Sequence, residues 1–137
     1  MDIIHPPDWA RLPGYSHGVS ARGRTIYLAG QVGTKGKDGW QPENQDLVSP
    51  DFVEQFRQVL ENIVALLSEA EAKPEHLVKL TWFITEKDVY FASLKALGTV
   101  YRAVIGKHFP AMSVIEVRGL VQPGAMIEIE ATAVVPD

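Results

Sequence analysis

Two glutamates near the end of the chain have the spacing of neighbours on one face of a β-strand. In the segment 126–135, MIEIEATAVV, Glu128 and Glu130 alternate with apolar residues. Side chains two residues apart in a strand share a face, so both carboxylates are predicted on the side opposite the buried one. A carboxylate held there could act as a general base towards water, at an interface between subunits. A solvated outer strand face has the same pattern, and both interpretations stay open.

Other patterns with known chemistry are missing from the sequence. The chain has no cysteine, which excludes disulfides, thiolate metal sites and a cysteine nucleophile. Its four histidines, among them His17, form no His-x-x-x-His pair, so no metal site is predicted. Neither a phosphate-binding glycine loop nor a Gly-x-Ser-x-Gly elbow is present. Trp82, within an apolar run, is expected to pack in the core or to line a pocket.

Length and composition describe a small globular protein. The 137 residues suit a single domain, 1–137, with 46% hydrophobic and 22% charged residues. The formal net charge of −4 disfavours nucleic acid as a partner. No apolar run approaches the roughly 18–20 residues that span a bilayer, and no signal peptide is visible. With no cysteine to oxidise, the chain fits the reducing cytoplasm, and we expect it there, away from membranes.

Hydrophobic periodicity predicts an α+β fold of order β-β-α-β-α-β-β, in which both helices cover one face of a mixed sheet. Residues 1–14 are predicted to be an extended arm and residues 33–44 a loop. The predicted strands are 17–21, 25–32, 77–85, 112–117 and 126–135, and the predicted helices run from Ser49-Pro50-Asp51 to before Pro74 and from 88 to 105.

Apolar stripes at helical spacing define the buried face of each predicted helix. In the first helix Ser49 is expected to cap and Pro50 to take the first helical position. The sheet face away from the helices is not simply polar, and self-association would cover it economically. The stripes are Phe52, Phe56, Val59, Leu60, Ile63, Val64 and Leu67, then Phe91, Leu94, Leu97, Tyr101 and Val104.

Six segments spread along nearly the whole chain have the form of known family motifs. They are Gly14-Tyr15-Ser16-His17, TIYLAGQVG at 25–33, FRQVLEN at 56–62, LTWFIT at 80–85, FPAMS at 109–113 and IEIEA at 127–131. In their order and spacing these segments resemble the motifs of the RidA/YjgF family of enamine/imine deaminases. No single segment is specific for the family, but the six together are.

This resemblance implies a chorismate-mutase-like fold and a homotrimer with a small-molecule cleft at each subunit interface. It also implies hydrolytic deamination of reactive enamines and imines without metal or cofactor. In the family an arginine binds the substrate carboxylate, and a glutamate with backbone groups holds the attacking water. The glutamate matches Glu128 as the catalytic residue, and the residues expected to line the cleft are Tyr15, Ala29, Gly30, Met112, Ser113 and Val114.

The chain departs from the family pattern at its most important position. Met112 stands where the arginine is expected, and methionine cannot pair with a carboxylate. Ala29 replaces a serine and His17 a glutamine, while Arg118 could supply a replacement charge only by reaching the cleft. Three interpretations follow: a deaminase for a larger or less anionic imine, a non-catalytic binding or interaction protein of the same trimeric fold, and a ribonuclease. The acidic charge and the lack of a His/Lys cluster make the ribonuclease the weakest.

Overall fold

The computed structural model describes residues 1–11, 13–35 and 47–137. Within these residues the main sheet has the order β3-β6-β4-β5, with β4 and β5 parallel and β6 antiparallel to β3 and β4. The mixed sheet is therefore confirmed. Its strands are β3 (Arg24–Gln31), β4 (Leu77–Ile84), β5 (Ala111–Glu116) and β6 (Ile127–Val135).

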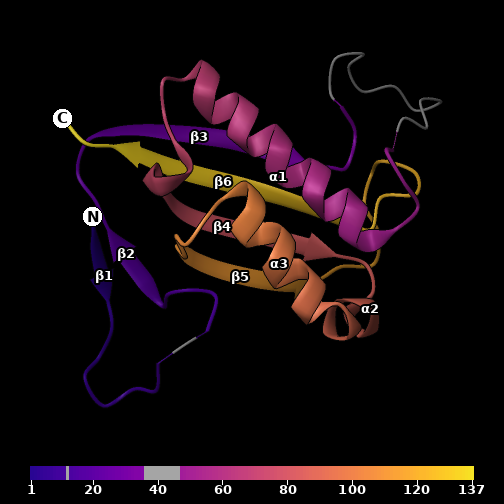
Figure 1. Cartoon of the computed structure of the whole chain (residues 1–137), viewed down its shortest axis with the longest axis horizontal. Coiled ribbons are helices and arrows are strands. Elements are labelled where there is room, and N and C mark those ends of the chain that lie inside the picture. The colour runs from indigo at the N-terminus through magenta and orange to yellow at the C-terminus, as the bar shows by residue number, and fades with distance from the viewer. Residues whose placement is uncertain (12, 36–46) are drawn as a thin grey trace.

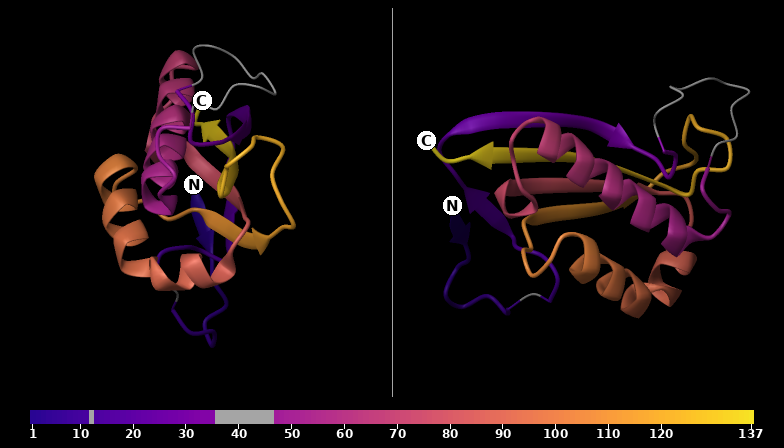
Figure 2. Two further views of the ribbon diagram at one scale, coloured as in Figure 1. Left: turned by 90° about the vertical axis from the view of Figure 1, so that its right-hand side faces the viewer. Right: turned by 45° about the horizontal axis from the view of Figure 1, so that its top comes forward.

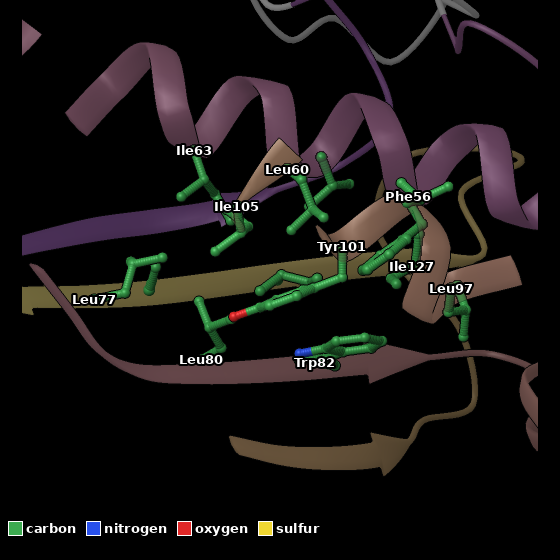
Figure 3. Close-up of a cluster of buried hydrophobic side chains, with 14 of the residues drawn as sticks. Phe56, Leu60, Ile63, Leu77, Leu80, Trp82, Leu97, Tyr101, Ile105 and Ile127 are labelled. Atoms are coloured by element: carbon green, nitrogen blue, oxygen red, sulfur yellow. The ribbon is translucent and has the colours of Figure 1, made fainter. Parts of the chain in front are cut away.

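Two helices, α1 (Phe52–Glu69) and α3 (Leu94–Val104), cover one face of this sheet and leave the other face uncovered (Figures 1 and 2). The predicted stripe of α1 is buried, apart from Val64, which is half-buried. It meets the alternate apolar residues of β4 and β6, and burial of each large side chain contributes about 1.5–3 kcal/mol (Figure 3). The facing residues of the strands are Leu80, Trp82, Ile127, Ile129, Ala131 and Ala133.

The start of α1 differs from the prediction by two residues. Asp51 caps the helix, because its carboxylate accepts a hydrogen bond from the Glu54 backbone N–H at 3.0 Å. Ser49, the predicted cap, instead accepts a hydrogen bond from the Asp51 N–H at 2.9 Å. This bond fixes the position of Asp51, the residue that caps the helix. A carboxylate is the stronger cap here, since it also complements the positive end of the helix dipole.

The second predicted helix is two helices, α2 (Lys87–Ala92) and α3. The backbone leaves helical geometry at Ser93 (φ −107°, ψ 3°), whose hydroxyl donates to the Val89 carbonyl at 2.7 Å. Such a bond from serine back to the preceding turn bends helices. The prediction that Phe91 and Leu94 are buried was therefore wrong, and these side chains are 63% and 50% exposed.

The N-terminal arm contains a strand that the sequence did not indicate. Strand β1 (Asp2–Ile4) pairs with β2 (Gly18–Ser20) in a separate two-stranded sheet. The arm is tied to the main sheet just before β5, because the Ser16 N–H donates to the Pro110 carbonyl at 3.1 Å and its hydroxyl donates to the Phe109 carbonyl at 2.7 Å. The loop predicted at 33–44 lies outside the described residues from position 36 onward.

Gln55 is a fully buried polar side chain that joins α1 to the segment entering β6. Its amide nitrogen donates to the carbonyls of Ser49 at 3.0 Å and Gly124 at 3.2 Å. Its amide oxygen accepts from the Met126 N–H at 2.9 Å. Three backbone groups of two distant loops are thus satisfied by one side chain, which sets where β6 begins.

Candidate functional site

The faces of β6 are as the sequence predicts. Ile127 and Ile129 are buried against the helices, whereas Glu128 is half-buried and Glu130 is exposed on the uncovered face of the sheet. In the pairing of β4 with β6, Glu128 lies opposite Phe83 and Glu130 lies opposite Thr81.

The Glu128 side chain lies directly over Gly30 of the neighbouring strand. The pairing of β3 with β6 is irregular between Leu28 and Gln31, so Ala29 and Gly30 sit in a local bulge. A Cβ atom added at Gly30 would lie 2.7 Å from Cδ and 2.9 Å from Cγ of Glu128. Glycine at this position leaves room for the carboxyl group, which therefore lies against the backbone at a strand irregularity.

The rest of the uncovered face mixes polar and apolar side chains. Ser113 of β5 lies on it and accepts a hydrogen bond from the Lys79 ammonium at 3.2 Å. Phe83 is half-buried, Ile115 is 44% exposed and Tyr27 is 81% exposed. A solvated sheet face would be more uniformly polar.

A pocket of about 800 Å³ lies on the opposite, helix-covered side, between α3, the start of β5 and the arm near Tyr15. It brings together four of the predicted site residues, namely Tyr15, Trp82, Met112 and Val114. The register explains why, since Met112 stands beside Leu80 and Val114 beside Trp82, on the face that the helices cover. The other lining residues are Pro13, Gly14, Tyr90, Leu94, Leu97, Gly98, Tyr101, Arg102, Lys107 and Phe109.

Several aromatic rings contribute to the wall of this pocket. Trp82 meets Tyr90 edge-on with ring centroids 6.2 Å apart, and Tyr101 stacks on Phe109 at 5.4 Å. Burial, together with the neighbouring Tyr15, raises the pKa of the Tyr90 phenol. Burial also raises the pKa of Tyr101, whose hydroxyl donates to the His108 carbonyl at 2.6 Å. Both phenols are therefore neutral hydrogen-bonding groups at ordinary pH.

One subunit does not place all the predicted site residues in one cavity. Met112 and Val114 face the pocket, while Ser113 and Glu128 lie on the other side of the sheet. A cleft containing both Met112 and Glu128 would have to take them from different subunits.

Two further candidates lie outside the pocket lining. The ring of His17 packs against Trp9 in the arm, with centroids 4.7 Å apart. Arg118 is exposed in the segment that follows β5. Among the residues described, no three His, Cys, Asp or Glu side chains are grouped to hold a metal ion, and no helix is long and apolar enough to cross a membrane.

Sequence reasoning missed several residues of the pocket wall. Gly98 had a readable signal, since glycine is a poor residue for the interior of a helix. Tyr90, Arg102 and Lys107 had none, because their convergence depends on how α3 crosses the sheet.

Two helices on one face of a mixed four-stranded sheet place the chain in the α+β class. The chain matches the family model described as Endoribonuclease L-PSP over residues 9–135. It is 30% identical over 129 residues to a human protein named 2-iminobutanoate/2-iminopropanoate deaminase, covering 91% of this chain and 85% of that protein. It is 32% identical over 119 residues to a RutC family protein of Pyrococcus abyssi, covering 87% and 84%.

Solved structures agree with these sequence relatives. The Rid-family protein YyfB of Yersinia pestis superimposes with a TM-score of 0.76 at 33% identity, covering 98% of each chain. RidA of an Antarctic Psychrobacter superimposes with a TM-score of 0.63 at 27% identity, covering 92% of each chain. The chain belongs to the RidA/YjgF family.

Proposed function

We propose that this protein is a cofactor-independent hydrolytic deaminase of a reactive enamine or imine metabolite. The observation that supports this most directly is the position of the Glu128 carboxyl group over Gly30, at the irregularity between β3 and β6. Relatives named as 2-iminobutanoate/2-iminopropanoate deaminases support this reaction class. Glu128 takes a proton from water while the water oxygen bonds to the imine carbon, and the protonated carboxyl group returns that proton to the imine nitrogen, which gives a neutral carbinolamine. The carboxylate then takes the hydroxyl proton of the carbinolamine and delivers it to the nitrogen as the C–N bond breaks, so one imine and one water give one ketone and one ammonia.

The proposal includes a homotrimer with a cleft at each subunit interface. The uncovered sheet face supports it, because Phe83, Ile115 and Tyr27 would otherwise stand in water. Assembly could also bring Glu128 of one subunit near the pocket that contains Met112 of another. Light scattering should give three times the subunit mass of 15.1 kDa. A monomer at micromolar concentration would contradict the assembly and the shared cleft.

Met112 separates the proposed substrate from the smallest 2-imino acids. A bidentate arginine–carboxylate contact contributes roughly 2–4 kcal/mol in a partly desolvated cleft, and methionine contributes none of it. The same substitution supports the alternative, a non-catalytic small-molecule-binding or interaction protein of the same fold. Both the deaminase and the non-catalytic protein would bind the small molecule, but only the deaminase would convert it.

A panel of 2-imino acids, generated in place by an amino-acid oxidase, tests the proposal. Semicarbazide traps the imine as its semicarbazone, so an active deaminase lowers the rate of semicarbazone formation. In a parallel reaction without semicarbazide, it raises the rate of ammonia release. Glu128→Gln should lower turnover of the best substrate at least about tenfold while the trimer persists. Glu130→Gln, on the same face but more exposed, is the matched control and should keep most of the activity. If no imine is consumed by the wild type, the non-catalytic alternative holds.

A further inference from the structure

Gly98 is a glycine that its backbone does not require. It lies inside α3, its φ is not in the left-handed region, and a Cβ atom there would meet nothing within 4 Å. Glycine in a helix interior costs about 0.5–1 kcal/mol relative to alanine, and no crowding offsets that cost here. The open space above Gly98 is the pocket, so this residue keeps a volume empty that a side chain would fill.

Trp82 supplies a second, independent sign of a ligand. Its side chain is only 6% exposed and lines the pocket, and its indole Nε1–H is buried without a hydrogen-bond partner. Leaving such a donor unpaired is costly, and it is rare in folded proteins. The nitrogen points toward the Leu80 side of the ring (Figure 3), where the adaptable Met112 side chain stands beside Leu80 in the register. Because this donor is buried, its pairing with an oxygen atom in the pocket requires a side chain of the pocket wall to shift.

The charged groups around the pocket have one sign. Arg102 and Lys107 line it, no aspartate or glutamate does, and among the described residues neither cation forms an ion pair. The cations are exposed, while the interior of the pocket is aromatic and aliphatic. The lining therefore suits a flat apolar body inside and an anionic group at the mouth.

We propose that this pocket binds an aromatic carboxylate, with the ring beside Gly98, the carboxylate at Arg102 and Lys107, and a neutral oxygen accepting from the Trp82 indole. As a statement about the substrate, this inference rests on the proposed function, and it names the larger imino acid as an aromatic one. As a statement about binding, it rests on the pocket alone.

Calorimetric titration with inert probes tests the binding without any turnover. The probe is 3-(4-hydroxyphenyl)propanoate, expected to bind with a dissociation constant of about 1 mM or tighter for a ligand of its size. Propanoate, which lacks the ring, should bind at least about fivefold more weakly. The corresponding amide, which lacks the charge, should bind about two- to fivefold more weakly. 3-Phenylpropanoate should bind about threefold more weakly, and Trp82→Phe should abolish that difference.

Two variants at Gly98 locate the binding in the pocket. Gly98→Leu fills the space and should weaken binding of the probe at least about tenfold. Gly98→Ala should bind the probe with an affinity within about threefold of the wild type. Both should raise the melting temperature, by about 2–4 °C for alanine, because the helix gains a better former. Arg102→Gln should weaken binding of the carboxylate probe but leave binding of the amide unchanged.

The outcomes separate this inference from the proposed function. The proposed binding site is wrong if the probe does not bind detectably at several millimolar. It is also wrong if Gly98→Leu and Gly98→Ala bind the probe equally well. If Gly98→Leu abolishes probe binding but the wild-type protein consumes no imine, the binding site is supported and the deaminase function is rejected. Turnover of an aromatic 2-imino acid that Gly98→Leu leaves unchanged rejects this pocket as the place where the substrate binds.

Discussion

Gly30→Ala is expected to lower imine hydrolysis by about 100-fold while leaving the protein folded. The added methyl carbon would lie 2.7 Å from Cδ and 2.9 Å from Cγ of Glu128. Carbon atoms in contact lie about 3.5–4.0 Å apart, so the carboxyl group must retreat by about 1 Å. Displacing a catalytic group by this distance commonly costs about 100-fold in rate.

The cost in stability should be much smaller than the cost in rate. Glu128 is half-buried on the uncovered face, so its flexible side chain can turn away without disturbing the helix-packed core. We expect less than the roughly 1–3 kcal/mol that overpacking causes in a closed core. Thermal unfolding followed by circular dichroism measures this loss.

A double-mutant cycle identifies the route by which Gly30→Ala acts. Turnover of the best imine is measured for the two single variants, Gly30→Ala and Glu128→Gln, and for the double variant. If the alanine acts by displacing the carboxylate, it should cost less than about threefold once Glu128 is already glutamine. Equal losses in both backgrounds, or wild-type turnover by Gly30→Ala, would refute the assignment of this carboxylate as the base.

Three further predictions concern other parts of the molecule. Met112→Arg restores a cation at the position where the family carries one, and should raise kcat/KM for 2-iminopropanoate by about 30- to 1,000-fold; unchanged kinetics would show that another group holds the carboxylate. Burial raises the pKa of Tyr101 above its ordinary 10.0, so the unfolded chain releases the proton first and stability falls as pH rises above about 10, by up to about 1.4 kcal/mol per pH unit. Tyr101→Phe should reduce the fall in unfolding free energy with pH, as measured by urea titrations at pH 9–11. An unchanged pH dependence would show that Tyr101 is not its cause. Gln55→Leu leaves three backbone groups without partners and should lower the free energy of unfolding by about 3 kcal/mol or more in urea; a loss under about 1 kcal/mol would show that the loops rearrange.

The main sheet and its first helix could be predicted because local patterns and tertiary packing agree there. The stripe from Phe52 to Leu67 is both periodic and buried. The second helix could not be predicted as two, since Phe91 and Leu94 continue its apolar period although tertiary structure leaves them exposed. The break depends on one serine hydrogen bond, which a propensity argument does not weigh.

The candidate site was predictable as a set of residues but not as an arrangement. In β6 the alternation is clear, and it places Glu128 away from the helices. In β5 the sequence AMSVIE has no alternation, so only the register with β4 shows that Met112 faces the pocket and Ser113 the other side. Family motifs assign both residues to one cleft, and only an assembly of subunits could unite them.

On the proposed function, the methionine at position 112 and the cations at the pocket mouth belong to one change in recognition. A cation inside an apolar pocket needs a bound anion to offset its desolvation, and it then selects for that anion more than for anything else. With Met112 in that place, the interior recognises apolar surface, and charge remains only on the exposed Arg102 and Lys107. Exposed ion pairs contribute about 0–1 kcal/mol, so a ligand must gain most of its affinity from burying a ring. A small imino acid offers a carboxylate but no ring to bury, so Met112 and the open pocket beside Gly98 both favour the proposed larger ligand.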